Sequence, residues 1–137
     1  MKSIEAVPYN DITDQDTFAI IALVKKGIVY NSFEKIYKEL PFTLEEWAHF
    51  IHTTTRTLQR WKKANAALPT LCAERIIEVY QLYKLGIEVF DIDGFNKWLY
   101  GNIEALDNKA PVYFLNNSQG INLVRTKLGR IQHGVLA

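Results

Sequence analysis

The stretch TLEEWAHFIHTTTRTLQRWKKA, residues 43–64, decides the fold that this sequence predicts. In its first half, Thr43 and Glu46 stand at the spacing of a capping box, in which each side chain accepts a hydrogen bond from the other residue's backbone amide. The apolar residues that follow recur at the spacing of one buried helix face. They are Leu44, Trp47, Ala48 and Ile51. We therefore predict a short helix that begins directly after Thr43.

A second helix should follow within the same stretch, after three consecutive threonines. His52 and Thr53 are expected to form a turn, and Thr54 can cap the next helix by accepting a hydrogen bond from its free amides. That helix would run from Thr55 to about Ala64. Two short helices joined by a tight turn form a helix-turn-helix, whose second helix enters the major groove of DNA.

The second helix separates into two faces when it is wound at about 100° per residue. Thr57, Leu58 and Trp61 gather on the face that should be buried. The opposite side collects side chains that can bond base edges or neutralise phosphates. The candidate DNA-binding residues are Thr54, Thr55, Arg56, Gln59, Arg60, Lys62 and Lys63. An ordinary amphipathic surface helix is the alternative interpretation of this charged face.

Charge is unevenly distributed along the chain of 137 residues, whose formal net charge is only +1. Residues 51–63 carry four Lys or Arg, residues 111–137 carry three, and neither segment contains Asp or Glu. Each segment is therefore a candidate surface for an anionic partner. The composition, 48% apolar and 23% charged, is typical of a compact globular protein.

The rest of the chain also reads as helices separated by short turns, so the predicted fold class is all-α. Asp14 or Asp16 could cap a first helix that Gly27 ends, and a second helix should span about residues 31–40. A long helix with a wide apolar face should span residues 70–90. The residues expected to be buried in the second and the long helix are Phe33, Ile36, Tyr37, Leu40, Leu71, Ile76, Val79, Tyr80, Tyr83, Ile87 and Phe90.

From Asp91 onward, turns rich in Gly, Asn and Asp interrupt the helical pattern, so we predict one domain of residues 1–90 and a second of residues 91–137. Ser118 is expected to cap the last helix. Its apolar stripe consists of Ile121, Val124, Leu128, Ile131 and Val135. The opposite face gathers Leu123, Thr126, Arg130 and His133, flanked by Lys127 and Gly134. This mixture suits a binding surface, although cations there could simply complement the helix dipole.

The segment WLYGNIEALDNKAPVYFLNNSQGINLVRTKLGRIQHGV, residues 98–135, resembles the toxin-binding domain of the Xre/MbcA/ParS antitoxins. The matching elements are Trp98-Leu99, Asn102, Ala105-Leu106, Pro111, Leu115, Gly120, Val124, Leu128-Gly129-Arg130-Ile131 and Gly134. The segment TRTLQR, residues 55–60, is similar to the Xre-type helix-turn-helix of the same proteins. Two positions depart from the family pattern, because Gly101 stands where proline is usual and Asn108 where glycine is common.

The resemblance implies an antitoxin of a type II toxin-antitoxin pair that forms a homodimer through its N-terminal helical region. It further implies that the chain represses its own operon by binding operator DNA and neutralises a RES-domain toxin, which consumes NAD, by covering the toxin's active site. A cationic surface would complement a cleft that holds the phosphates of a dinucleotide. The candidate toxin-binding residues are Leu123, Thr126, Lys127, Arg130, His133, Gly134, Val135 and Leu136, with Ala137 completing the tail.

Two other functions stay open at this point. The chain could be a stand-alone transcriptional regulator whose C-terminal part makes it oligomeric. It could also be a protein-only adaptor that has lost DNA binding, because such turns often contain glycine and this one has His52 and Thr53.

Catalysis, cofactors and a membrane location are not expected. His49 and His52 lack further ligands at a spacing typical of zinc sites, and Asp91 and Asp93 fit turn or cap roles better than a calcium loop. The single cysteine, Cys72, excludes an internal disulfide and favours a reducing compartment. Residues 18–24 are apolar but too few to span a bilayer, and their flanking charges are wrong for a signal peptide, so we expect a cytoplasmic protein.

Overall fold

The structure, a computed structural model, describes residues 18, 21–22 and 25–134. Within these residues the fold is all-α, as predicted, and the only β-type pairing consists of two isolated bridges. The elements are α2 (Tyr30–Glu39), α3 (Leu44–Phe50), α4 (Thr55–Ala64), α5 (Thr70–Val89), α6 (Ile92–Tyr100), η3 (Glu104–Leu106), η4 (Pro111–Phe114) and α7 (Ser118–Gln132), where η marks a 3-10 helix.

The glycine predicted to end the first helix has the expected conformation. Gly27 has φ 98°, in the left-handed region where glycine commonly terminates helices. Residues 18, 21–22 and 25–26, which precede Gly27, are helical. The predicted caps Asp14 and Asp16 lie outside the described residues.

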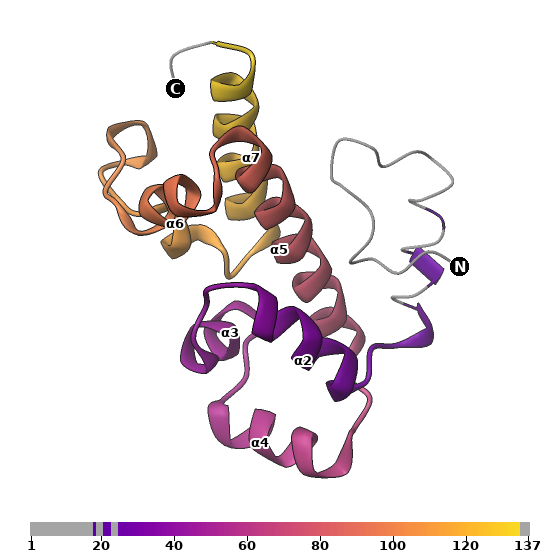
Figure 1. Cartoon of the computed structure of the whole chain (residues 1–137). Coiled ribbons are helices and arrows are strands. Elements are labelled where there is room, and N and C mark those ends of the chain that lie inside the picture. Colours follow the sequence, from indigo (N-terminus) through magenta and orange to yellow (C-terminus); the bar gives the residue numbers. More distant parts are fainter. Residues whose placement is uncertain (1–17, 19–20, 23–24, 135–137) are drawn as a thin grey trace.

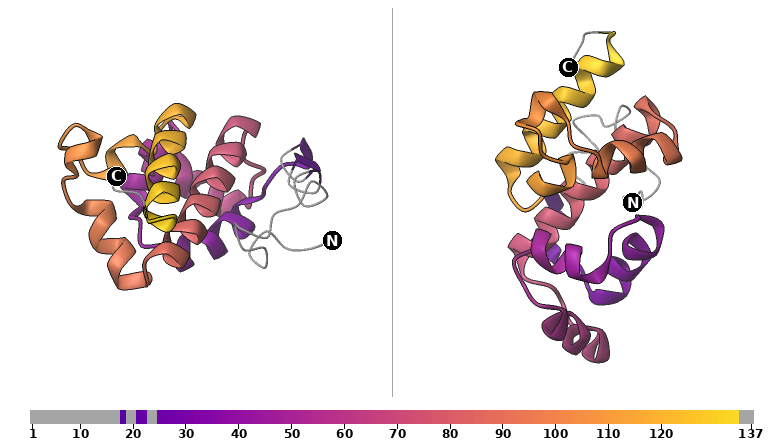
Figure 2. Two further views of the ribbon diagram at one scale, coloured as in Figure 1. Left: turned by 90° about the horizontal axis from the view of Figure 1, so that it is seen from above. Right: turned by 90° about the vertical axis from the view of Figure 1, so that its left-hand side faces the viewer.

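Helix α5 forms the axis of the molecule (Figure 1). Helices α2, α3 and α4 gather around one end of it, while α6 and α7 cover the other. Both views of Figure 2 show α7 lying beside α5. The buried residues of α5 consequently occur on several sides of the helix, as its wide apolar face predicts. They are Cys72, Ala73, Ile76, Ile77, Val79, Tyr80, Leu82, Tyr83, Leu85 and Gly86.

The prediction that Leu71 is buried is wrong, because its side chain is 79% exposed. In a helix, the residues three, four and seven positions further along lie on the same face. After Leu71 these are Glu74, Arg75 and Glu78. Leu71 therefore lies on the polar face of α5. The residue type of leucine alone does not predict this position.

One apolar core joins the two predicted domains. A single cluster of buried residues extends from Ile28 to Leu128, and the half-buried Tyr37, Ile87 and Phe90 pack against it. The ring of Trp47 packs edge to face at centroid distances of 5.3 to 5.8 Å on three phenylalanines, namely Phe33, Phe42 and Phe50. Because α5 contributes to the core on both sides, the division at residue 91 stays a prediction.

Candidate nucleic-acid and partner interfaces

The capping box predicted for α3 is present. The Thr43 hydroxyl accepts a hydrogen bond from the Glu46 amide at 3.1 Å, and the Glu46 carboxylate accepts one from the Thr43 amide at 2.9 Å. The helix buries Trp47 and Ala48, whereas Leu44 is only half-buried. Its start is thus fixed by two side chains and its position by contact with the core.

The turn between α3 and α4 lies at His52 and Thr53, as predicted. His52 has φ 59°, the left-handed conformation that favours glycine. The amide of Thr53 donates to the carbonyl of Ala48 at 2.9 Å, which closes the turn. Thr54 then caps α4, because its hydroxyl accepts a hydrogen bond from the Thr57 amide at 3.1 Å. A histidine therefore adopts the backbone conformation for which helix-turn-helix turns often use glycine.

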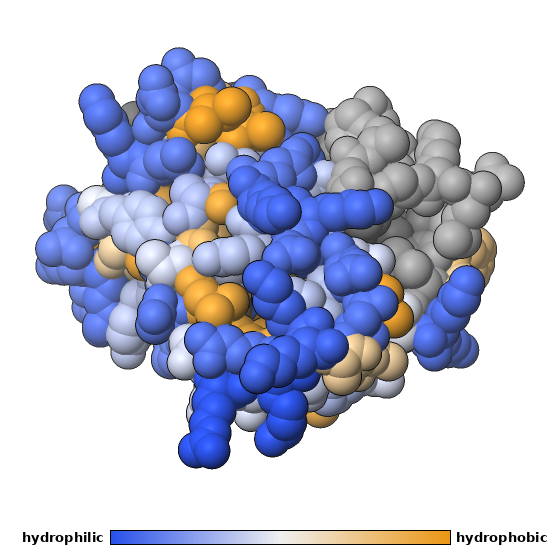
Figure 3. All heavy atoms as spheres, turned by 60° about the horizontal axis from the view of Figure 1, so that its bottom comes forward, coloured by the Kyte–Doolittle hydropathy of each residue, from blue (hydrophilic) through white to orange (hydrophobic). Residues whose placement is uncertain are grey.

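Helix α4 presents two faces that match the prediction. Leu58 is fully buried, and Thr57 and Trp61 are half-buried against the rest of the molecule. Among the candidate DNA-binding residues, Thr54 and Thr55 lie at the start of the helix, and the side chains that follow on the outer face are exposed. The exposed ones are Arg56, Gln59, Arg60, Lys62 and Lys63. Figure 3 brings this end of the molecule forward, and hydrophilic side chains dominate the face that it shows.

Lys62 differs from the other cations of α4. Its ammonium group lies 3.2 Å from the carboxylate of Glu34 on α2, and the hydrogen bond between them raises the pKa of Lys62. Within the part of the chain that the structure describes, no ion pair engages Arg56, Arg60 or Lys63. The open face of α4 thus presents three cations to a partner. Lys62 can contact a partner's anion only after its ion pair with Glu34 breaks.

The end of α4 shows a contact that we did not predict from the sequence. Asn65 has φ 43° and ends the helix in the left-handed conformation. Its side-chain carbonyl accepts a hydrogen bond from the Asn31 amide at 2.9 Å, so it also ties α4 to α2. Asparagine after a helical stretch is the usual second choice to glycine at this position, which is the signal that could have identified it.

The prediction that Ser118 caps α7 is wrong by one residue. Asn117 is the N-cap, because its side-chain carbonyl accepts a hydrogen bond from the Gly120 amide at 2.7 Å. Ser118 is the first helical residue, and its hydroxyl donates instead to Glu78 on α5 at 3.1 Å. Both residue types are good caps, so local sequence alone does not choose between them.

The inner stripe of α7 packs as predicted over most of its length. Ile121, Val124 and Leu128 are fully buried against the core. Ile131 is half-buried near the end of the helix. The last member of the stripe, Val135, lies outside the described residues.

The outer face of α7 is open. Thr126, Arg130 and His133 are exposed, Leu123 is 39% exposed, and Lys127 is half-buried. These side chains come from successive turns, and among the described residues no ion pair engages Arg130. Gly134 follows the helix with φ 76°. The remaining residues of the predicted toxin-binding set, Val135 and Leu136, lie with Ala137 outside the described residues.

Cys72 is buried, and its thiol donates to the carbonyl of Ile51 at 3.4 Å. Asp91 caps α6 by accepting a hydrogen bond from the Gly94 amide at 2.6 Å, which confirms its predicted cap role.

No group of three or more His, Cys, Asp or Glu able to hold a metal occurs in the described part of the chain. No helix in that part combines the length and apolarity needed to cross a membrane.

No protein-family model matches the chain, and no curated protein matches it.

Proposed function

We propose that this chain is a DNA-binding antitoxin that performs no chemistry itself. In this proposal α4 binds the operator of its own operon, and the outer face of α7 binds a RES-domain toxin and covers its active site. The observation that carries the proposal is the open face of α4. Helix α4 follows a capped helix and a tight turn. The cations on its open face, Arg56, Arg60 and Lys63, engage no acid among the described residues.

The geometry of α4 supports a role in reading DNA. A recognition helix contacts bases with the residues of its first turns and phosphates with flanking cations. Arg56 and Gln59 lie in the first two turns of α4 and are exposed, and both types of side chain can form paired hydrogen bonds with purine edges. Arg60 and Lys63 lie one turn further along, where they can neutralise the backbone.

A mobility-shift titration with the DNA immediately upstream of the coding sequence tests the first half of the proposal. Replacing Arg56 or Gln59 with alanine should weaken binding by about 1–3 kcal/mol if the residue contacts a base, whereas Lys63→Ala should reduce the slope of affinity against salt by about one unit. Lys97→Ala, an exposed cation on α6, is the matched control and should bind as the wild type does. Unchanged binding by the Arg56→Ala Gln59→Ala double variant would contradict the recognition-helix assignment. No detectable binding by the wild-type chain, even at low salt, would favour the protein-only adaptor.

The outer face of α7 supports the second half of the proposal. It places an exposed leucine beside cations, which suits an interface with an apolar centre and charges that steer association. The sequence resemblance to toxin-binding domains covers the same helix. Arg130, exposed near its end, is the residue best placed to reach a phosphate-binding cleft.

Co-purification of the chain with the product of the neighbouring gene tests this half. An Arg130→Glu variant with an intact fold should lose potency as an inhibitor of that product, because it reverses the sign of the proposed contact. The Lys97→Glu variant makes the same charge change on α6 and should inhibit normally. A chain that emerges from co-expression alone would instead indicate a stand-alone regulator.

The same proposal includes a homodimer, since paired recognition helices read paired half-sites. Exposed apolar side chains at the N-terminal end of α5 support it. Leu71 is 79% exposed, and Val29, which pairs with Ala67 shortly before this helix, is 39% exposed. Leu71→Glu should lower the apparent mass in sedimentation if this end forms the dimer, and an unchanged dimer would place the interface elsewhere.

A further inference from the structure

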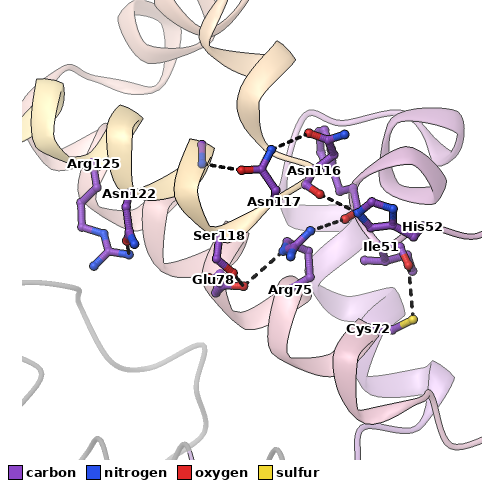
Figure 4. A network of polar contacts seen from close by, with 12 residues as sticks. Ile51, His52, Cys72, Arg75, Glu78, Asn116, Asn117, Ser118, Asn122 and Arg125 are labelled. Atoms are coloured by element: carbon purple, nitrogen blue, oxygen red, sulfur yellow. Dashed lines mark hydrogen bonds and ion pairs between the residues drawn. The ribbon is translucent and has the colours of Figure 1, made fainter.

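A chain of polar contacts joins the helix-turn-helix to the start of α7 across α5 (Figure 4). The last carbonyl groups of a helix have no partner within it. At the end of α3, the guanidinium of Arg75 donates to the Phe50 carbonyl at 2.9 Å. The same guanidinium donates to Glu78 at 3.2 Å, and Glu78 also accepts the bond from Ser118 at 3.1 Å. Elements far apart in the sequence thus meet through two side chains of α5.

His52 makes a second and more direct connection. Its ring nitrogen Nε2 lies 2.6 Å from the carbonyl oxygen of Asn116. Because a carbonyl can only accept, Nε2 carries the proton and donates it. Asn116 directly precedes the cap of α7, and His52 stands two residues before the cap of α4, which is Thr54. One hydrogen bond therefore links the residues that lead into the two proposed binding helices.

The backbone of His52 makes this bond consequential. A φ of 59° is uncommon for a residue with a side chain, although histidine is one of the residue types that adopt it more often. The ring of His52 is anchored on Asn116, so displacement of Asn116 removes a contact that holds the left-handed conformation. The direction in which the chain enters α4 depends on that conformation. A shift at the first turn of α7 can thus reach the recognition helix.

We propose that His52 is a positioning residue that couples the two surfaces, so that a change in the first turn of α7 alters the affinity of α4 for DNA. The inference rests on the proposed function, because it assigns a regulation to the same recognition helix. The two states are the turn with the ring bonded to Asn116 and the turn with the ring released. A partner that binds α7 more tightly in one state favours that state and so changes the affinity for DNA, and bound DNA changes the partner's affinity by the same factor.

A double-mutant cycle on the full chain tests the coupling without requiring the toxin. Asn117→Ala removes the cap bond to Gly120 and loosens the first turn of α7. His52→Gly removes the ring but accepts the left-handed backbone. In the presence of His52, Asn117→Ala should change the dissociation constant for the upstream DNA about fivefold, within the usual range of coupling between sites. In the His52→Gly background the same change should have no effect, and equal effects in both backgrounds would overturn the proposal.

Two conservative variants test whether the ring of His52 itself carries the coupling. Asn117→Asp retains the cap oxygen and loses only the amide that donates to the Asn116 side chain at 3.1 Å, so DNA affinity close to that of the wild type is expected if the cap sets the first turn of α7. His52→Asn retains a residue type that tolerates the left-handed conformation but is shorter than histidine, so it should abolish the coupling as His52→Gly does. Coupling that survives His52→Asn would show that the ring is not the link.

Amide hydrogen exchange provides a readout that does not depend on DNA binding. The Leu58 amide donates to the Thr54 carbonyl at 3.0 Å, and with the Thr57 amide it reports opening of the first turn of α4. Asn117→Ala should speed exchange at both amides in the presence of His52 and leave it unchanged in the His52→Gly background. Failure of the wild-type chain to bind DNA would reject the proposed function, while this exchange cycle would still decide the coupling. Equal changes in the two backgrounds would reject it.

Discussion

At the scale of single residues, Gly120 shows how closely the C-terminal half is packed. A Cβ atom at this position would lie 2.1 Å from the carbonyl oxygen of Phe114 and 3.0 Å from its Cβ atom. The residue sits in the first turn of α7, where η4 approaches the helix backbone. Only a residue without a side chain permits this approach, which gives a physical reason for glycine here.

Gly120→Ala should destabilise the protein by about 1–3 kcal/mol, because the added methyl group forces backbone atoms apart. Urea unfolding followed by circular dichroism measures the change. Gly129→Ala is the matched control in the same helix, since nothing lies within 4 Å of its Cβ position. It should stabilise the protein by about 0.5–1 kcal/mol through helix propensity. Two variants of equal stability would contradict the packing argument.

Single residues also mark where sequence reasoning succeeds and fails. Helical spacing assigns Leu58 and Trp47 to the core, and both are buried. Residue type alone also assigns Leu71 to the core, but its face of α5 is polar. The ion pair between Lys62 and Glu34 could not be predicted from the sequence. It depends on the packing of α2 against α4, which no local sequence pattern encodes.

At the scale of elements, the sequence predicts most helices because caps are local. The bond between Thr54 and Thr57 joins residues three positions apart and needs no tertiary information. The predicted start of α7 is one residue late, because asparagine and serine compete as caps and the contact of Ser118 with α5 decides between them. Between α6 and α7, where turn residues interrupt the helical pattern of the sequence, the structure has the short 3-10 helices η3 and η4.

Thr54→Ala should destabilise the protein by about 0.5–2 kcal/mol, since it removes the acceptor for the Thr57 amide. Thr54→Ser retains the hydroxyl and should remain close to the wild type. Chemical denaturation of both variants checks this. A loss of stability shared by both would point to the missing methyl group instead of the cap.

At the scale of the whole molecule, the shared core has an experimental signature. Buried residues of α2 and α7 belong to one cluster through α5, so the two halves should open together. The most slowly exchanging amides of these two helices should report the same free energy of opening and the same urea dependence. Two distinct values would indicate two independently folding domains, as the predicted boundary at residue 91 implies.

The position of α5 also limits how this protein can be recombined. Its residues share one apolar core with α2, α3 and α4 at one end and with α6 and α7 at the other. A chimera that joins the N-terminal half to a foreign C-terminal half would leave α5 facing side chains for which it was not shaped. Substitutions on the outer face of α7 should therefore be tolerated, whereas replacement of the whole C-terminal half should require compensating changes along α5.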